Sequence, residues 1–171
     1  AMSCREWASV HLHTRSQCFA KRGHRVVVIS SQFDAIEGVE VIHIKRPDVP
    51  LIHDFLFLRE YWRILKEINA DIIHVHYASS PGAWMVGALD THPLVVTLMG
   101  GDILFDERGT YTPSRHQMTI NLLKTADLIT VELAHFIDVI VQKGVSKDKA
   151  KIVLWGIDLN KFKPQNTHDL R

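Results

Sequence analysis

Short apolar runs recur along the chain and alternate with longer stretches in which apolar residues are spaced three or four apart. The runs at 72–75 and 94–98 contain few polar residues. Strands that are covered on both faces have this pattern, and such strands belong to parallel sheets. The run at 38–44 alternates instead, which favours a strand nearer an edge of the sheet. The predicted strands cover residues 25–30, 38–44, 72–75, 94–98, 126–131 and 151–154.

The stretches between these runs predict helices. Ser80 is expected to cap one helix and Pro81 to occupy its first turn, where a missing N–H costs nothing. The helix at 55–68 has an apolar stripe at helical spacing, formed by Phe55, Leu58, Trp62, Leu65 and Ile68. The inner face of the first helix is expected to hold Ala8, Leu12, Cys18, Phe19 and Ala20. The predicted helices cover residues 7–22, 55–68, 81–91, 113–124 and 134–143.

The order of these elements predicts the fold. Strand and helix alternate about five times with short connections. This is typical of an α/β, Rossmann-like domain, in which a doubly wound parallel sheet is flanked by helices through right-handed crossovers. Such a sheet normally begins with a strand, and none is visible before residue 7, so we expect the first strand to be missing. One domain is expected over residues 1–164, followed by the start of a linker at 165–171.

Composition narrows the class of protein. The chain has 171 residues, of which 46% are hydrophobic, and a net charge of +1. This length allows a sizeable core, and the near-zero charge argues against a general nucleic-acid binder. Two cysteines, Cys4 and Cys18, favour reduced thiols over a disulfide framework. No apolar run approaches the ~20 residues of a membrane span and no signal peptide is visible, so we expect a cytoplasmic protein.

Two loops that follow predicted strands carry unusual residues. His76 and Tyr77 follow one strand, and the sequence Gly-Gly-Asp at 100–102 follows the next. Ligands of open parallel sheets bind at the carboxyl ends of the strands, so these loops are expected to share one hollow. The glycines fit either a nest of N–H groups for a phosphate or sugar hydroxyl, or a tight turn with positive φ. Asp102 fits either a sugar-binding carboxylate or a turn cap.

The histidines raise the question of a metal, because the chain has eleven of them. No group shows metal-ligand spacing such as H-E-x-x-H. His74 and His76 are expected on opposite faces of their strand, with His74 in the core. His76, at the carboxyl end, is the better site candidate, although a lone histidine is more often structural. The patterns G-x-G-x-x-G, G-x-S-x-G and Walker A are absent, which argues against NAD, ATP and serine-nucleophile chemistry.

Three further features each allow two interpretations. Arg5 could meet a diphosphate, because its guanidinium fits phosphate oxygens, or it could be a flexible terminal residue. Trp155 could stack on a sugar, line a cleft or pack between domains. One helix face could contact a membrane and suit a lipid-linked acceptor, or could simply be solvated. That face consists of Arg59, Trp62, Arg63 and Lys66.

Several stretches together are similar to a known family. FAKRGHRV (19–26), DIIHVH (71–76) and VVTLMGGD (95–102) appear in order, the last being like the family pattern TxHGxD. ADLI (126–129), Gly144, KIVLWGID (151–158) and FKP (162–164) follow, and the last two are like NGVDxxxFxP. In this order and spacing the chain resembles the N-terminal half of a GT-B glycosyltransferase of the retaining family 4 type.

The chain departs from the family pattern at four places. Met99 stands where the family often has His, and a thioether cannot carry a proton. The pair Leu-Trp at 154–155 replaces Pro-Asn, and Glu132 replaces a common Ser. Arg-Glu-Trp at 5–7 occupies the region of the usual glycine pair.

The resemblance implies a hexosyltransferase-type enzyme when complete. Its N-terminal half would bind the acceptor and complete the cleft for retaining transfer from a nucleotide sugar. A C-terminal domain, absent here, would bind most of the donor, so the isolated domain is expected to be inactive. The resemblance also implies no metal or other cofactor, and a glycan or lipid-linked acceptor. Contact with the inner membrane surface stays open.

The resemblance also assigns candidate residues. Those expected at the acceptor or sugar are His76, Tyr77, Met99, Gly100, Gly101 and Asp102. Those expected at the cleft or domain junction are Arg5, Glu132, Trp155, Gly156 and Asp158. Two other functions remain open: a sugar-nucleotide epimerase of the same fold, and a non-enzymatic binding or regulatory module.

Overall fold

The computed structural model describes residues 7–30, 35–44, 53–104, 112–156 and 159. These residues form six strands and five α-helices, close to the ranges predicted from the sequence, and strand and helix alternate except that β2 follows β1 directly. In chain order the elements are α1 (Trp7–Lys21), β1 (Val27–Ser30), β2 (Glu40–His43), α2 (His53–Ile68), β3 (Ile73–His76), α3 (Pro81–Ala88), β4 (Leu94–Thr97), α4 (Pro113–Thr125), β5 (Leu128–Val131), α5 (Ala134–Gln142), the 3-10 turn η2 (Lys147–Lys149) and β6 (Ala150–Ile152).

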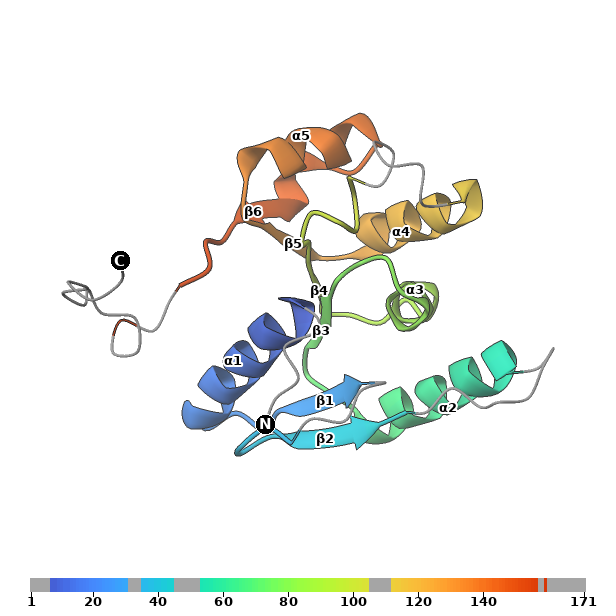
Figure 1. Cartoon of the computed structure of the whole chain (residues 1–171). Helices are drawn as coiled ribbons and strands as arrows, with labels where there is room; N and C mark the ends of the chain where they lie inside the picture. Colours follow the sequence, from blue (N-terminus) through green and yellow to red (C-terminus); the bar gives the residue numbers. More distant parts are fainter. Residues whose placement is uncertain (1–6, 31–34, 45–52, 105–111, 157–158, 160–171) are drawn as a thin grey trace, which may run out of the picture.

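All strand pairs are parallel, which confirms the predicted sheet type. The strands form two sheets rather than one: β1 pairs with β2, and β3, β4, β5 and β6 follow one another in a second sheet. Figure 1 shows the two groups one above the other, with the β1–β2 pair at the bottom of the view. Within the described residues no strand lies between β1 and β3 to join them.

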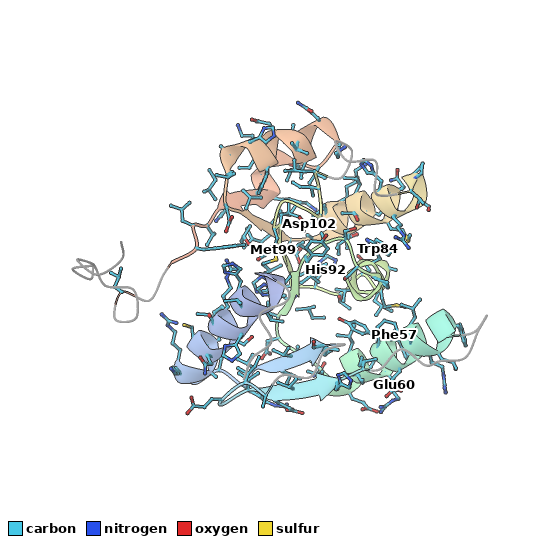
Figure 2. All side chains as sticks on the ribbon, in the orientation of Figure 1. Phe57, Glu60, Trp84, His92, Met99 and Asp102 are labelled. Carbon is cyan, nitrogen blue, oxygen red and sulfur yellow. The ribbon has the colours of Figure 1, made fainter. Side chains whose placement is uncertain are left out.

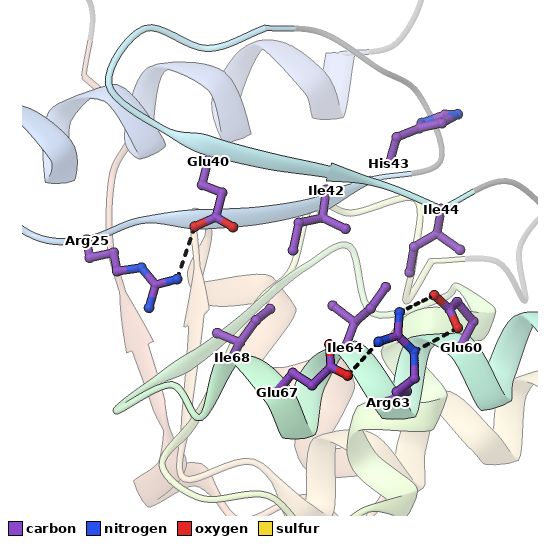
Figure 3. Close-up of a pocket in the computed structure, with 10 residues that line it drawn as sticks. All are labelled: Arg25, Glu40, Ile42, His43, Ile44, Glu60, Arg63, Ile64, Glu67 and Ile68. Carbon is purple, nitrogen blue, oxygen red and sulfur yellow. Dashed lines mark hydrogen bonds and ion pairs between the residues drawn. The ribbon is translucent and has the colours of Figure 1, made fainter.

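Helices cover the strands on both sides. Figures 1 and 3 both show α1 and α2 on opposite sides of the β1–β2 pair. In the other half, α3 and α4 approach each other closely at Gly87. A Cβ added at this glycine would lie only 3.0 Å from Leu122 Cα. The indole N–H of Trp84 on α3 also donates to Thr119 Oγ1 on α4 at 3.0 Å.

The core lies in the half that contains β3–β6. Leu94, Val96, Leu98 and Ile129 on or next to its strands have no exposed surface, and α4 and α5 add Leu123 and Ile140 to the same cluster. Burying each such side chain contributes roughly 1.5–3 kcal/mol before conformational entropy is counted. The almost unbroken apolar runs of the sequence therefore belong to strands that are covered on both faces.

Local signals fixed the start of α3. Ser80 is its N-cap and accepts a hydrogen bond from the Ala83 N–H at 3.3 Å, while Pro81 occupies the first turn, as predicted. At the amino edge of the sheet, Asp127 accepts hydrogen bonds from the Leu94 N–H at 2.7 Å and from His92 Nδ1 at 2.8 Å. This contact joins the start of β4 to the start of β5.

The predicted inner faces of two helices were wrong in part, although Leu65 of the predicted α2 stripe does pack against the core. On α1, Cys18 is exposed and Phe19 is 44% exposed; the helix has little periodicity, so its apolar residues do not mark a face. On α2, Phe55 is 69% and Trp62 44% exposed, whereas Ile64 is buried. Apolar residues on α2 fit two overlapping stripes, and the one with Tyr61, Ile64 and Leu65 is the one that packs.

Candidate functional site

The loops after β3 and β4 meet at the carboxyl edge of the sheet, as predicted. The Tyr77 N–H donates to the Thr97 carbonyl at 3.2 Å. One carboxylate oxygen of Asp102 accepts from the Ala78 N–H at 2.8 Å, and the other accepts from the Met99 N–H at 3.0 Å. Figure 2 shows Met99 and Asp102 together near the centre of the molecule. The two loops are thus held at one rim by a single side chain.

The Asp102 carboxylate is turned towards the backbone of the two loops. It has no exposed surface. Burial raises the pKa of its carboxyl group, and the backbone N–H groups of Ala78 and Met99 oppose that shift. A carboxylate that accepts two backbone hydrogen bonds can stay buried because its desolvation is compensated. The alternative role as a turn cap is therefore the one that the structure supports.

The two glycines of this loop have different surroundings. Gly100 has φ +87°, and a Cβ there would lie 3.1 Å from Phe136 Cζ. Residues other than glycine rarely adopt this φ. The tight-turn interpretation therefore holds at Gly100. Gly101 is exposed, and a Cβ there would meet the Tyr77 hydroxyl at an ordinary contact distance of 3.7 Å. Gly101 and Tyr77 thus lie next to one another on the rim.

Tyr77 has an unusual backbone conformation for an aromatic residue. Its φ is +72°, a region that bulky side chains seldom occupy. Strained residues of this kind persist where the surrounding structure holds them, and they concentrate at functional sites. The hydrogen bond from its N–H to the Thr97 carbonyl helps to hold Tyr77 in this position.

His74 and His76 lie on the same face of β3, so the prediction of opposite faces was wrong. Side chains two positions apart on a strand share a face, and the two ring centroids are 4.1 Å apart. His74 Nε2 lies 2.7 Å from Thr97 Oγ1. Nδ1 of His76 is buried and has no hydrogen-bond partner among the described residues. His76 therefore has a buried polar atom that is available to a ligand or a water molecule.

Both imidazoles are neutral at physiological pH. Burial, reinforced by the nearby Arg15 charge, lowers the pKa of His74 to about 4. Burial lowers the pKa of His76 to about 3, with further contributions from His74, Arg15 and His11. Neutral imidazoles can each donate one hydrogen bond and accept another.

Sequence reasoning missed Arg15 and His11 on α1. The Arg15 guanidinium donates to Thr97 Oγ1 at 3.1 Å and lies 5.9 Å from the ring centroid of Trp155. The rings of His11 and Trp155 are 3.5 Å apart between centroids. Residues four positions apart share a helix face. The spacing of His11 and Arg15 could therefore have indicated that they act together. Thr97 receives contacts from Arg15, His74 and Thr130, whose hydroxyl is 2.7 Å away.

Two residues predicted for the domain junction, Glu132 and Trp155, lie near Arg15. Glu132 follows β5, where burial raises the pKa of its carboxyl group and the Arg15 charge opposes the shift. Trp155 follows β6 and contacts α1; its Nε1 is buried without a hydrogen-bond partner in the described part of the chain. Gly156 is exposed, and no atom lies within 4 Å of its Cβ position. Arg5 and Asp158 lie outside the described residues.

The rim thus presents hydrogen-bonding groups of several kinds around one positive charge. Neutral imidazoles, a guanidinium and exposed backbone beside Gly101 are groups that bind hydroxyls or anionic oxygens. In the residues that the structure describes, no group of three or more His, Cys, Asp or Glu side chains could hold a metal ion.

A separate groove of about 500 Å³ lies between β2 and α2, away from this rim (Figure 3). Its apolar residues are Ile42, Ile44, Ile64 and Ile68. Charged side chains at its border are paired, Arg25 with Glu40 at 3.1 Å and Arg63 with Glu60 at 2.6 Å.

On the α2 face considered for membrane contact, two of the basic side chains already have partners within the helix. Arg63 is paired with Glu60 and Glu67, and Lys66 Nζ lies 5.9 Å from the Trp62 ring centroid. Among the described helices, none is long and apolar enough to cross a membrane.

The parallel sheet, its flanking helices and the site at its carboxyl rim define a Rossmann-like domain of the GT-B class. Within that class the chain belongs to Glycosyltransferase Family 4, whose sequence model matches residues 8–161. No curated protein sequence gives a significant match.

Solved structures show the same fold at low sequence identity. Anabaena HepE in complex with UDP-glucose is 19% identical with a TM-score of 0.71, over 97% of this chain and 45% of that one. The HepE complex with UDP gives 18% identity and a TM-score of 0.69, with the same coverage. A Listeria monocytogenes protein assigned as a UDP-N-acetylglucosamine 2-epimerase gives 11% and 0.61, over 83% of this chain and 41% of that one. The chain therefore spans less than half the length of these proteins.

Proposed function

We propose that the chain is the N-terminal, acceptor-binding half of a glycosyltransferase that moves a hexose from a nucleotide sugar with retention of configuration. The observation that supports this most strongly is the family match over residues 8–161. The meeting of the loops after β3 and β4 at one rim also supports it, because the proposal needs a surface for the acceptor at the carboxyl ends of the strands.

In this proposal the donor is held mainly by a second domain that this chain does not contain. Anabaena HepE was solved with UDP-glucose, and this chain covers 45% of it. A transferase needs both reactants aligned, and half of the alignment is lost when one domain is absent. Residues 1–171 alone are therefore expected to be inactive. The proposal requires no metal or other cofactor.

The acceptor is expected to lie over Tyr77, Met99 and Gly101. Tyr77 offers a ring and a hydroxyl beside Gly101, and glycine lets a sugar approach the backbone closely. Met99 has no proton to transfer. Catalysis in this proposal comes from positioning the reactants and stabilising charge as the nucleoside diphosphate leaves. The positive charge of Arg15 behind the rim favours that build-up of negative charge.

The direct test is turnover by the full-length protein. UDP-glucose and other nucleotide sugars are incubated with it, with and without a panel of glycan and lipid-linked acceptors, and nucleotide release is measured. We expect release that depends on one donor and rises with an acceptor. NMR of the product tests retention of the anomeric configuration, and residues 1–171 alone serve as the inactive control. Absence of turnover with every nucleotide sugar would count against the proposal.

The same assay separates the alternatives. An epimerase, suggested by the fold of the Listeria monocytogenes protein, would convert one nucleotide sugar into its epimer without any acceptor. A non-enzymatic module would bind a nucleotide sugar or glycan and release no nucleotide. Fractionation of cells that express the full-length protein tests the expected cytoplasmic location and the contact with the inner membrane surface.

A further inference from the structure

We propose that the acceptor carries a carboxylate, as an acidic sugar does, and that this carboxylate binds at a cluster of side chains between α1 and the segment after β6. The cluster, which we call the α1 cluster, consists of His11, Arg15, His76 and Trp155. The proposal rests on the proposed function, because it names the class of acceptor.

The members of the α1 cluster lie close to one another. His11 and Arg15 are one turn apart on the same face of α1. The ring centroids of His11 and Trp155 are 3.5 Å apart, and the guanidinium carbon of Arg15 lies 5.9 Å from the Trp155 ring centroid. His76 lies near enough to His11 and Arg15 for both to act on its imidazole electrostatically.

The α1 cluster adjoins the surface proposed for the acceptor. The Arg15 guanidinium donates to Thr97 Oγ1 at 3.1 Å, and the Tyr77 N–H donates to the carbonyl of the same threonine at 3.2 Å. Tyr77 also follows His76 directly in the chain. A charged substituent on a sugar that lies over Tyr77 can therefore meet the guanidinium.

Several polar groups of the α1 cluster lack a partner within the described part of the chain. Nε1 of Trp155 and Nδ1 of His76 are buried and form no hydrogen bond there. No carboxylate of a described residue forms an ion pair with Arg15. Buried polar groups without partners are costly. A single carboxylate can accept from the indole N–H, the guanidinium and an imidazole N–H together, and so satisfies all three.

The charge of the α1 cluster favours a carboxylate over a phosphate monoester. Arg15 carries the one positive charge of the four residues, because burial lowers the pKa of His11 and lowers that of His76 to about 3. A carboxylate has one negative charge, whereas a phosphate monoester has about 1.5–2 at pH 7. The carboxyl group of Glu132 already interacts with Arg15, so the excess charge of a phosphate would be left uncompensated in a partly buried place.

The ligand can reach these groups from solvent. His11, Arg15 and Trp155 are each partly exposed. Among the described residues, the segment that leads to Trp155 is bonded to the sheet as far as Val153, whose N–H donates to the Val131 carbonyl at 2.8 Å. Beyond Trp155, a Cβ added at Gly156 would meet no atom within 4 Å. The indole can therefore shift enough to give its N–H to a ligand oxygen.

Binding of matched sugars to the full-length protein tests the proposal. Methyl β-glucuronide and methyl β-glucoside share one ring and differ in a carboxylate against a hydroxymethyl group; the galacto pair differs in the same way. Dissociation constants are measured by NMR titration without a nucleotide sugar, so that any effect of Arg15 on the leaving diphosphate does not enter. In at least one pair we expect the acid to bind about 10-fold or more tightly than the neutral sugar.

Two variants test the charges that produce this preference. Arg15→Gln should weaken binding of the acid about 10-fold and leave binding of the neutral sugar unchanged. Glu132→Gln should have the opposite effect, because it removes the negative charge that interacts with Arg15; the acid should bind about 2–5-fold more tightly. Melting temperatures show that each variant is folded.

Two further variants complete the set. Trp155→Phe keeps an aromatic ring and removes the indole N–H, so it should weaken binding of the acid about 2–10-fold without affecting the neutral sugar. The matched control is Arg63→Gln, which changes an arginine of the groove between β2 and α2 and should alter neither constant.

Glucose 6-phosphate tests the choice between the two oxyanions, because it carries a phosphate monoester on the carbon that bears the carboxylate in the glucuronide. It should bind more weakly than the glucuronide, and tighter binding would overturn the assignment of a carboxylate. Equal binding of acid and neutral sugars in both pairs would also overturn it. So would a preference for the acid that survives in Arg15→Gln.

Turnover separates this proposal from the proposed function. Nucleotide release that rises with neutral acceptors alone would overturn the carboxylate site and leave the proposed function in place. Carboxylate binding that depends on Arg15, without release from any nucleotide sugar, would support the site and count against the proposed function.

Discussion

The two sheets of this protein differ in how deeply their strands are buried. In the β3–β6 half, Leu94, Val96 and Ile129 have no exposed surface, and one apolar cluster links the strands to α3, α4 and α5. In the β1–β2 half, Val28 is the only strand residue in the described part of the chain that is buried. The candidate site lies almost entirely on the first half.

The difference shows how the fold positions the site. The loops after β3 and β4 are anchored on the strands that are best packed, and Asp102 joins one loop to the other. From the β1–β2 half, α1 reaches this rim through Arg15 and His11. Rigid strands hold a site precisely in place, whereas an element with few buried contacts can shift.

The largest effect is expected from core substitutions that compare the two halves. Ile129→Ala on β5 leaves a cavity in a fully buried site and should lower the free energy of unfolding by about 2–5 kcal/mol. Ile42→Ala on β2, which is only partly buried, should cost clearly less. Urea denaturation at equal protein concentration measures both. Equal losses would contradict the contrast between the halves.

The next effect concerns the carboxylate that joins the loops. Asp102→Ala leaves the Ala78 and Met99 N–H groups without their acceptors, at about 1–3 kcal/mol for each buried group. Asp102→Asn retains one acceptor oxygen and should lose about half as much. Both losses are measured by urea denaturation. If Asp102→Ala were as stable as the wild type, the loops would be held together by other contacts.

The buried histidines predict that stability falls in acid. Their pKa values in the folded protein are about 4 for His74 and about 3 for His76, below the unfolded value of about 6.5. Between these limits the unfolded chain binds more protons, so stability is lost as pH falls below 6.5. The loss to pH 5 is roughly 1–2 kcal/mol per histidine.

A variant isolates this effect from other titrating groups. Arg15→Gln removes the positive charge that helps to lower both pKa values. Its unfolding free energy should therefore fall less steeply than that of the wild type between about pH 5 and pH 3, the range in which the folded-state imidazoles take up protons. An equally steep fall in both proteins would show that Arg15 does not act on these imidazoles.

The smallest effect on stability separates the two glycines. Gly100→Ala forces a side chain into positive φ and against Phe136, and should cost about 1–2 kcal/mol. Gly101→Ala has room for its Cβ and should change the unfolding free energy by less than about 0.5 kcal/mol. Thermal melts of the two variants decide; a larger loss at Gly101 would reverse the assignment.

Sequence patterns predicted strands, helices and the shared rim well, because periodicity and the Ser80–Pro81 start signal act locally. They failed where long-range contacts decide. Nothing in the pattern shows that Asp102 turns inward to the backbone of another loop, or that α1 turns Arg15 towards β4. The shared face of His74 and His76, in contrast, follows from their two-residue spacing alone.

The central claim is that the rim formed by the loops after β3 and β4 is where sugar transfer takes place. Its most direct test is the initial rate of nucleotide release by full-length Gly101→Val, with the melting temperature measured on the same sample. The account predicts a melting temperature close to that of the wild type and a rate at least about 100-fold lower, a loss of about 2.7 kcal/mol in transition-state stabilisation. A folded variant that transfers sugar at the wild-type rate would contradict it.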